Sequence, residues 1–289
     1  MSLTRPSSSP GHLRLGLPKG RMEAAVLTLL AEAGIHVRAS ARGYRPRVSL
    51  PDTEAKLLKP QNVVEMLAAG SRDVGFAGAD WVAELDADLV ELLDTGLDPV
   101  QVVAAAPDGD LPRRRLVVAS EYRRLACAWI VGRGLDAEFV HSYGATEVFP
   151  PEDADVIVDN TASGATLEAN GLRVVDCLLR SSTRLFANPR ALDVADRRRR
   201  VEDLVLLLRS VLDARGRVMI EVNASADCLE AVVRVLPAMR RPTVAPLFGN
   251  DGYAVKAAVP PELLPQVIPA LKNAGGTDVV VSRLSQIVP

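Results

Sequence analysis

Residues 156–170 read Val-Ile-Val-Asp-Asn-Thr-Ala-Ser-Gly-Ala-Thr-Leu-Glu-Ala-Asn, and this stretch decides what kind of fold surrounds it. An apolar β-branched run ends in Asp159, small residues follow over 161–165, and an amphipathic segment begins at Thr166 and stops at Asn170. This order predicts a strand, a loop and a helix, which together form the repeating unit of an α/β protein.

The small-residue loop has the features of a phosphate site. A loop that leads into a helix N-terminus turns several backbone N–H groups toward one point, where the helix dipole adds partial positive charge. Ser163 and Thr166 can add hydroxyl donors, and Asp159 can accept hydrogen bonds from sugar hydroxyl groups. The stretch therefore indicates a ribose 5-phosphate site. Because any α/β unit reverses direction through such a corner, other segments must decide between the two interpretations.

The amino-acid composition limits both the fold class and the kinds of partner that the protein can bind. The chain has 289 residues, of which 48% are hydrophobic and only 4% aromatic, so the core must consist of Val, Leu, Ile and Ala. Such a core suits parallel strands covered by helices. The 34 basic and 36 acidic residues give a formal charge of -2. No global field would therefore attract nucleic acid or an anionic membrane, and any anion site must be local.

Cysteine usage and the N-terminal segment favour a cytoplasmic location. The three cysteines, Cys127, Cys177 and Cys228, lie far apart and form no Cys-x-x-Cys pair, which argues against a disulfide framework and a structural zinc site. Residues 1–12 are rich in Ser and Pro and lack the apolar core of a signal peptide. We interpret them as a disordered tail. No later apolar run reaches the length needed to span a membrane.

Two further segments carry candidate binding residues. Lys19 and Arg21 bracket a glycine between a strand (13–17) and a helix (22–33), which predicts a second anion site, although basic residues at such turns can also serve solubility alone. In residues 70–81, Gly75 interrupts a strand and Gly78 closes it, just before Asp80-Trp81. Such glycines imply that something approaches the backbone closely; the alternative is a tight packing turn.

The order of predicted elements indicates two lobes and a third domain. Residues 13–102 and 181–214 form lobe I, in which 44–50 is a predicted strand, 61–69 a helix and 191–214 a long helix. Residues 103–180 form lobe II, which contains the small-residue loop. Because the chain crosses twice between the lobes, we expect a hinge and a ligand cleft between them.

Residues 215–289 form the predicted third domain. Its predicted order is strand 218–222, helix 227–239, strands 243–247 and 253–259, helix 261–274 and strand 278–284, the split βαβ pattern of a ferredoxin-like unit. Such units usually serve association or ligand sensing, which fold alone does not prove. Arg197–Arg200 is a run of four arginines, which we interpret as a solvated face or as pairing between subunits.

Several segments together resemble one family. Residues 156–167 resemble the phosphoribosyl-pyrophosphate loop of phosphoribosyltransferases, and with Ala169-Asn-Gly-Leu172 the loop is similar to that of ATP phosphoribosyltransferase. The match covers nearly the whole chain after residue 12. The other matching segments, in the same order and spacing, are Leu17–Arg21, Gly70–Trp81, Ser181–Asn188 and Arg241–Leu247.

The resemblance implies the first step of histidine biosynthesis. In that reaction, N1 of the ATP adenine displaces pyrophosphate from C1 of phosphoribosyl pyrophosphate with inversion, assisted by Mg²⁺. The resemblance also implies a two-lobed catalytic core like that of periplasmic binding proteins and a C-terminal regulatory domain that binds histidine as feedback inhibitor. It further implies a homo-oligomer between dimer and hexamer. This is the family's long form, which needs no separate regulatory subunit.

The family's functional residues carry over onto matching positions. Asp159, Lys19 and Arg21 are implied to be catalytic. Asp159 would hold the ribose hydroxyls, and the phosphate would be held by Thr161, Ala162, Ser163, Gly164, Ala165, Thr166 and Leu167. ATP would contact Lys19, Gly20, Arg21, Lys59, Gly78 and Asp80. Histidine would contact Asn223 and Thr243, and no metal ligands are assigned.

Three positions depart from the family's pattern. Asn160 stands where the family commonly has a second acid, and Lys59 and Asn62 stand where it commonly has Arg and Asp. Lysine cannot reproduce the two-pronged hydrogen bonding of arginine. The alternative function is therefore a catalytically weak or silent relative that senses a nucleotide or an amino acid.

Overall fold

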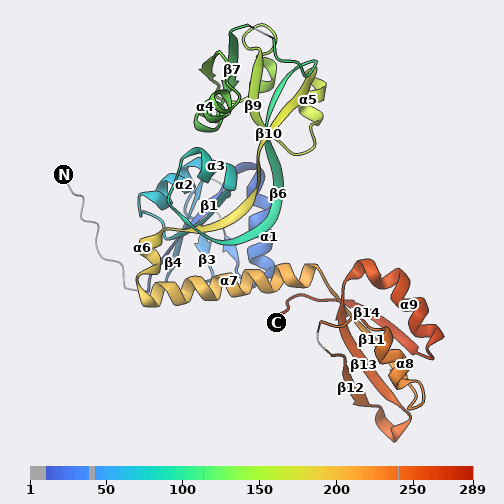
Figure 1. The fold of residues 1–289 in the computed structure, drawn as a ribbon. Helices are drawn as coiled ribbons and strands as arrows, with labels where there is room; N and C mark the ends of the chain where they lie inside the picture. Colours follow the sequence, from blue (N-terminus) through green and yellow to red (C-terminus); the bar gives the residue numbers. More distant parts are fainter. Residues whose placement is uncertain (1–10, 39–42, 113, 240, 289) are drawn as a thin grey trace. The chain divides into compact units, whose positions relative to one another are not determined.

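The computed structural model describes residues 11–38, 43–112, 114–239 and 241–288. The predicted disordered tail falls outside the described residues except for Gly11 and His12. The chain forms two compact units, residues 1–205 and 206–289 (Figure 1).

One eight-stranded mixed sheet runs through the described part of the first unit, in the order β4-β1-β5-β10-β6-β9-β7-β8. Its two longest strands, β6 and β10, pair antiparallel from Pro107 and Leu172 at one end to Val90 and Ala187 at the other. The bounds are β1 Leu13–Pro18, β4 Thr53–Leu58, β5 Val74–Gly78, β6 Val90–Pro107, β7 Leu116–Ser120, β8 Ala137–His141, β9 Val156–Thr161 and β10 Leu172–Ala187.

The long strands β6 and β10 belong to both lobes (Figure 1). In lobe II, residues 101–105 of β6 pair with β9, whereas in lobe I residues 183–187 of β10 pair with β5. The register between β6 and β10 shifts on both sides of Ser182. Such bulges bend a strand and increase its twist. The chain therefore crosses between the lobes twice, through one bent ribbon.

Helices cover both parts of this sheet. In lobe I, Val63, Val64 and Leu67 pack with Ala77 and Phe186, and all five are buried. In lobe II the buried core contains Val156 and Val158 with Tyr122 and Trp129. The helices are α1 Glu23–Glu32, α2 Pro60–Ala68, α3 Ala79–Glu84, α4 Arg123–Gly132, α5 Ala165–Ala169, α6 Pro189–Leu192 and α7 Ala195–Arg215, with short 3-10 turns at Gly20–Met22 (η1) and Thr146–Val148 (η2).

The predicted strand at residues 44–50 is wrong in position. Within it only Arg47–Val48 (β3) is extended, and it pairs with Val37–Arg38 (β2) in a separate two-stranded ribbon. The strand that joins the large sheet is β4, where Ala55 and Leu57 point into the core. Polar residues alternate in both segments, so the sequence pattern did not distinguish them.

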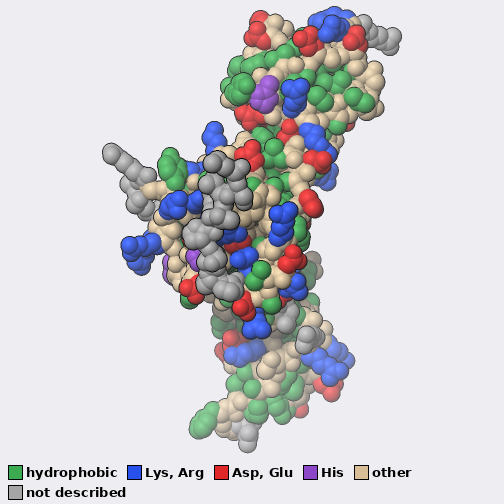
Figure 2. All heavy atoms as spheres, turned by 90° about the vertical axis from the view of Figure 1, so that its left-hand side faces the viewer, with side chains coloured by type: hydrophobic (Ala, Val, Ile, Leu, Met, Phe, Trp, Pro, Cys, Tyr) green, Lys and Arg blue, Asp and Glu red, His purple; other side chains and the backbone are tan. Residues whose placement is uncertain are grey.

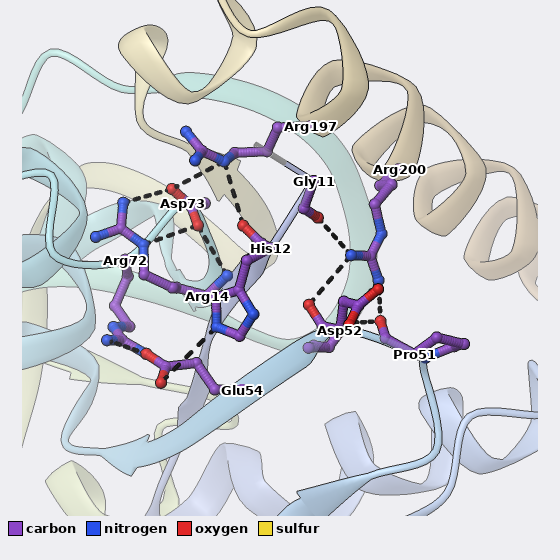
Figure 3. A network of polar contacts seen from close by, with 11 residues as sticks. Gly11, His12, Arg14, Pro51, Asp52, Glu54, Arg72, Asp73, Arg197 and Arg200 are labelled. Atoms are coloured by element: carbon purple, nitrogen blue, oxygen red, sulfur yellow. Dashed lines mark hydrogen bonds and ion pairs between the residues drawn. The ribbon is translucent and has the colours of Figure 1, made fainter. Parts of the chain in front are cut away.

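The predicted long helix 191–214 is two helices, because α6 ends at Leu192 and α7 begins at Ala195. The run of arginines at its start also differs from the prediction (Figure 3). The Arg197 Nε lies 3.6 Å from Asp73 Oδ1, and Arg200 donates hydrogen bonds to the carbonyl groups of Gly11 and Pro51. A solvated face or pairing between subunits is therefore the wrong interpretation for these two residues.

The second unit contains a four-stranded antiparallel sheet in the order β12-β13-β11-β14. By chain order this is 2-3-1-4, the split βαβ arrangement. Ile220, Val222, Val255 and Ala257 pack with Val232 and Leu271 of the two helices in one buried core. The elements are β11 Val218–Ala224, α8 Leu229–Val235, β12 Thr243–Pro246, β13 Tyr253–Val259, α9 Leu264–Asn273 and β14 Thr277–Arg283, with 3-10 turns at Phe248–Asn250 (η3) and Pro261–Leu263 (η4).

The predicted fold class is confirmed: a two-lobed α/β core is followed by a ferredoxin-like domain. Helix α8 is shorter than predicted, because Leu236 precedes Pro237 and adopts an extended backbone, as residues before proline do. Basic and acidic side chains are interspersed over the face that Figure 2 shows. Within the described residues, no helix is both long enough and apolar enough to cross a membrane.

Candidate active site

The small-residue loop at the end of β9 is open to solvent. The side chains of Ala162, Ser163 and Thr166 are exposed, while Leu167 of α5 is buried and anchors the helix. The Gly164 N–H donates to Thr161 Oγ1 at 3.0 Å, which closes the turn, and Gly164 has a φ of 82°. The predicted loop is therefore present and accessible, as a phosphate site requires.

Asp159 lies in the carboxyl-terminal half of β9 and is half-buried. Burial is the main cause that raises its pKa from 3.8 to about 6, and the nearby Glu147 and Glu121 raise it further. A hydrogen bond of 2.7 Å from the Asn160 N–H to Asp159 Oδ1 acts in the opposite direction. An acid with this pKa is a strong acceptor near neutral pH.

A cavity of about 390 Å³ brings the loop together with lobe I. Arg21 from η1 and Asp159 both line it, so one cation of lobe I and one carboxylate of lobe II share the cavity. Of the predicted phosphate residues, Thr161, Ala162, Ser163, Thr166 and Leu167 line this cavity. Gly164 lines a separate cavity of about 640 Å³, together with Leu167 and Glu168 of α5.

A second cavity, of about 220 Å³, holds most of the predicted ATP residues. Lys19, Arg21, Gly78 and Asp80 line it together with Tyr122 of lobe II. Lys59 instead lines a third cavity, of about 710 Å³. Gly20, which was also predicted to contact ATP, lies in the sequence between Lys19 and Arg21, which both line the second cavity. Glu121 lines all three cavities, which therefore adjoin one another in a continuous cleft between the lobes.

Asp80 is buried at the centre of a hydrogen-bond network. Its Oδ2 accepts from the Tyr122 hydroxyl at 2.6 Å, and its Oδ1 accepts from the Ser181 hydroxyl at 2.6 Å. The Asn160 Nδ2 donates to the same tyrosine oxygen at 3.0 Å. Burial and the Asp80 charge raise the pKa of Tyr122 far above its ordinary value, so the tyrosine is a permanent donor. Asn160, which departs from the family pattern, thus belongs to this network.

Two aromatic rings shape the second cavity. Trp81 stacks on Tyr122 with ring centroids 4.7 Å apart, which places a flat apolar surface beside Asp80. The Lys19 ammonium lies 4.2 Å from the centre of the Tyr44 ring, a cation–π contact at the rim of the site. A planar ligand with polar edges suits this combination of rings, carboxylate and cations.

The sequence predicts that something approaches the backbone closely at the glycines of β5. In the structure, the atoms that approach Gly75 and Gly78 belong to the protein itself. A Cβ at Gly75 would lie 2.7 Å from Val63 Cγ1 and 3.1 Å from the Gly16 carbonyl oxygen. One at Gly78 would lie 2.1 Å from Asp80 Oδ1. The alternative of tight packing therefore explains both positions, although at Gly78 the packing holds Asp80 in place.

The arrangement follows from strand direction. Because β1 and β5 run parallel, as do β7 and β9, their carboxyl ends share one edge within each lobe. Lys19 and Arg21 follow β1 and Asp80 follows β5. In lobe II, Glu121 follows β7, and Asp159 comes directly after the buried part of β9. Open α/β sheets bind ligands at this edge.

Sequence reasoning missed several lining residues of lobe II. Thr146 and Glu147 line the first cavity from η2, which follows β8, and Glu121 follows β7. A signal was present, because each of these residues stands shortly after a strand, as Asp80 does after β5. Asn62 also lines the third cavity, where its Nδ2 donates to Glu65 Oε2 at 3.0 Å.

The two predicted histidine residues lie in the second unit. The Asn223 Nδ2 donates to Asp278 Oδ2 at 3.1 Å, and Thr243 is exposed on β12. Ile220 and Val222 of β11 point into the core, so Asn223 does not point with them, because successive side chains of a strand alternate. Asn223 and Thr243 lie on strands separated by β13. Their role stays a prediction.

Two family models match this chain. The model described as ATP phosphoribosyltransferase matches residues 59–210, and the model described as HisG, C-terminal domain, matches residues 214–286. The chain belongs to the ATP phosphoribosyltransferase family. The predicted resemblance is thereby confirmed, as is its implication that the chain is a pentosyltransferase of histidine biosynthesis.

Relatives of similar length support this membership. The ATP phosphoribosyltransferase of Chlorobium luteolum is 34% identical over 288 residues, which cover 96% of this chain and 97% of the relative. That of Pelotomaculum thermopropionicum is 35% identical over 289 residues, which cover 96% and 99%. Among solved structures, the ATP phosphoribosyl transferase (HisG:HisZ) complex from Thermotoga maritima has a TM-score of 0.64 at 25% identity and covers 70% of this chain and 98% of that chain.

Proposed function

We propose that this chain transfers the phosphoribosyl group of phosphoribosyl pyrophosphate to N1 of ATP, with release of pyrophosphate. One observation carries the proposal: Arg21 of lobe I and the loop that follows Asp159 in lobe II line the same cavity, beside a second cavity that contains Asp80. A phosphate site, a diol acceptor and a place for a planar base thus adjoin one another.

Phosphoribosyl pyrophosphate would bind along the first cavity. The N–H groups of residues 163–166 and the hydroxyls of Ser163 and Thr166 suit the 5-phosphate. The Asp159 carboxylate, which lines the same cavity, suits the ribose hydroxyls. Arg21 then faces the pyrophosphate or the phosphates of ATP.

The adenine would enter the second cavity from the Trp81 side. N1 of adenine carries a free lone pair, so the reaction needs alignment and charge neutralisation more than a strong base. Electrons move from N1 to C1 of the ribose while the C1–O bond to pyrophosphate breaks. Lys19 and Arg21, which both line this cavity, can stabilise the negative charge that develops on the leaving group.

The carboxylates of the first cavity fit a Mg²⁺ ion shared with substrate. No group of three or more His, Cys, Asp or Glu residues in the described ranges could hold a metal alone. Mg²⁺, however, is commonly held by one or two carboxylates together with substrate phosphates. Burial is the main cause of the raised pKa of Asp159, and the charges of Glu147 and Glu121 raise it further. A bound Mg²⁺ would neutralise charge on the pyrophosphate.

Regulation and assembly are finer parts of the same proposal. The chain carries its own C-terminal domain, and residues 214–286 match the corresponding family model. We infer that histidine binds there, with Asn223 and Thr243 as the residues to test. We also infer a cytoplasmic homo-oligomer between dimer and hexamer. The Thermotoga maritima relative, by contrast, was solved as a complex with HisZ.

A product assay tests the catalytic proposal. Purified protein with ATP, phosphoribosyl pyrophosphate and Mg²⁺ should form phosphoribosyl-ATP, detected by mass spectrometry, and histidine should slow its formation. Asp159→Ala or Arg21→Ala should lower kcat/KM by at least about tenfold. Binding of both substrates by calorimetry with no product would favour the silent, ligand-sensing alternative instead.

A further inference from the structure

The N-terminus of helix α4 in lobe II is capped by a residue of lobe I. The Glu84 carboxylate, from the end of α3, accepts hydrogen bonds from the Arg124 N–H at 2.9 Å and from the Leu125 N–H at 3.0 Å. These N–H groups belong to the first turn of α4, where no intrahelical partner exists. Glu84 is 9% exposed and lines the edge of the third cavity, and both bonds are partly buried.

Lobe II does not supply this cap itself. Tyr122 occupies the N-cap position of α4 and makes no side-chain cap. The Ser120 hydroxyl lies nearby, but it accepts from the Tyr122 N–H, which lies ahead of the helix. A carboxylate at a helix N-terminus is favourable both as an acceptor and through the helix dipole. The Glu84 carboxylate can therefore cap the N-terminus of α4 only while the two lobes keep their present distance.

Further contacts join the same two helices. The Arg124 guanidinium donates to the Ala83 carbonyl at 2.8 Å and pairs with Asp86 at 2.7 Å. The Tyr122 hydroxyl bonds Asp80, and its ring stacks on Trp81. We call this set the α3–α4 contact: it consists of residues 80–86 of lobe I against residues 122–125 of lobe II.

The α3–α4 contact is separate from the two strands that connect the lobes covalently. Those strands, β6 and β10, carry register shifts near Ser182, and such irregularities interrupt the regular ladder and bend the strands locally. Arg21 of lobe I and Asp159 of lobe II face one cavity but belong to different lobes. Their separation therefore depends also on the α3–α4 contact, in which Glu84 accepts hydrogen bonds from two backbone N–H groups of lobe II.

We propose that Glu84 is a positioning residue, which sets the distance between the lobes by capping α4 and thereby aligns the two halves of the active site. This inference rests on the proposed function for its kinetic consequence only. A ligand held by lobe II alone should not depend on Glu84. The binding of a ligand that touches both lobes should become weaker when Glu84 is replaced.

The first test measures lobe distance directly. In the full-length protein with the exposed Cys177 replaced by Ser, nitroxide labels at Ala31→Cys in α1 and Val131→Cys in α4 report the separation of the lobes by pulsed electron paramagnetic resonance. Glu84→Ala should broaden the distance distribution relative to the parent. An unchanged distribution would overturn the proposal, whether or not the protein proves to be an active transferase.

The second test compares ligands. In Glu84→Ala, kcat/KM for ATP should fall on the order of tenfold, while the calorimetric affinity for ribose 5-phosphate, which lacks the pyrophosphate that would face Arg21 of lobe I, should stay within about twofold. Equal losses for both ligands would indicate a purely structural role and refute the proposal. If the unsubstituted protein formed no product, the proposed function would fail while the distance measurement still decided the role of Glu84.

Two matched variants complete the design. Glu84→Gln keeps one acceptor oxygen and should therefore give an effect between those of the parent and Glu84→Ala, which also guards against a variant that fails to fold. Asp88→Ala removes the same charge from an exposed position four residues further along and should leave both readouts unchanged. A Glu84→Gln variant with a larger effect than Glu84→Ala would contradict capping.

Discussion

Tyr122 of lobe II donates a hydrogen bond of 2.6 Å to Asp80 of lobe I, and both residues are buried. Its hydroxyl therefore lies where the two halves of the cleft meet, while its ring remains stacked on Trp81.

Tyr122→Phe should preserve the stack and remove this bond. Asp80 would keep the Ser181 hydroxyl as its side-chain partner. We expect a loss of about 1–3 kcal/mol in the free energy of unfolding, because a buried acceptor loses a donor, together with a higher KM for ATP. Urea denaturation and initial-rate kinetics measure the two effects. Tyr253→Phe, in the C-terminal unit, is the matched control, and an equal effect there would refute the assignment.

Asp159 should make stability and activity respond to pH in opposite directions. Its pKa is about 6 in the folded protein against an ordinary 3.8, so the folded state binds the proton more tightly. Stability should consequently fall as pH rises from about 4 to about 6. Asp159→Asn should remove this component from a series of urea denaturations at different pH values.

Activity should rise over the upper part of that range, because the ionised carboxylate is the better acceptor for ribose hydroxyls. The expected profile of kcat/KM for phosphoribosyl pyrophosphate increases through a pH of about 6. The profile should be measured over about one pH unit on either side of the Asp159 pKa, from about pH 5 to about pH 7. If kcat/KM stays constant over this range, Asp159 does not take part in ribose binding.

Gly164→Ala should strain the phosphate loop without a clash. Gly164 has a φ of 82°, and an added Cβ would meet no atom within 4 Å. The cost, about 1 kcal/mol, is therefore conformational, and relief of the strain would move the loop N–H groups away from the phosphate. Calorimetry should show weaker binding of phosphoribosyl pyrophosphate.

Gly134→Ala is the control for this loop substitution. Gly134 has a φ of 62° and equally open surroundings, but it follows α4 outside the three cavities of the cleft. Gly134→Ala should lower the free energy of unfolding by a similar amount and leave the affinity for phosphoribosyl pyrophosphate unchanged. Equal losses of affinity in both variants would show that the loop has no special role.

Arg197→Ala should destabilise the first unit, whereas Arg199→Ala should not. Arg197 donates to the His12 carbonyl at 3.4 Å and lies near the buried Asp73, which also accepts from Arg14 at 2.6 Å. Its loss should cost about 1 kcal/mol in urea denaturation. Arg199 is exposed on the same helix, so the identical substitution there should be close to neutral. Equal effects would restore the interpretation of the run as a solvated face.

The sequence by itself determined the local features. The apolar run that ends at Asp159, the small-residue loop and the order of elements in the C-terminal domain follow from periodicity and from residues with restricted backbones, which act over a few positions. These features, with the motif order, were enough for the fold class and the family, and for a minority of the lining residues of the cleft.

Tertiary structure decided what depends on residues far apart in the chain. The bond from Tyr122 to Asp80 joins positions 42 apart, and the cap from Glu84 to Arg124 joins positions 40 apart. No periodic pattern encodes such pairs, because they depend on how β6 and β10 bend between the lobes. The misplaced strand at 44–50 has the same origin: alternation predicts an extended chain, but only packing against β1 selects Thr53–Leu58 for the sheet.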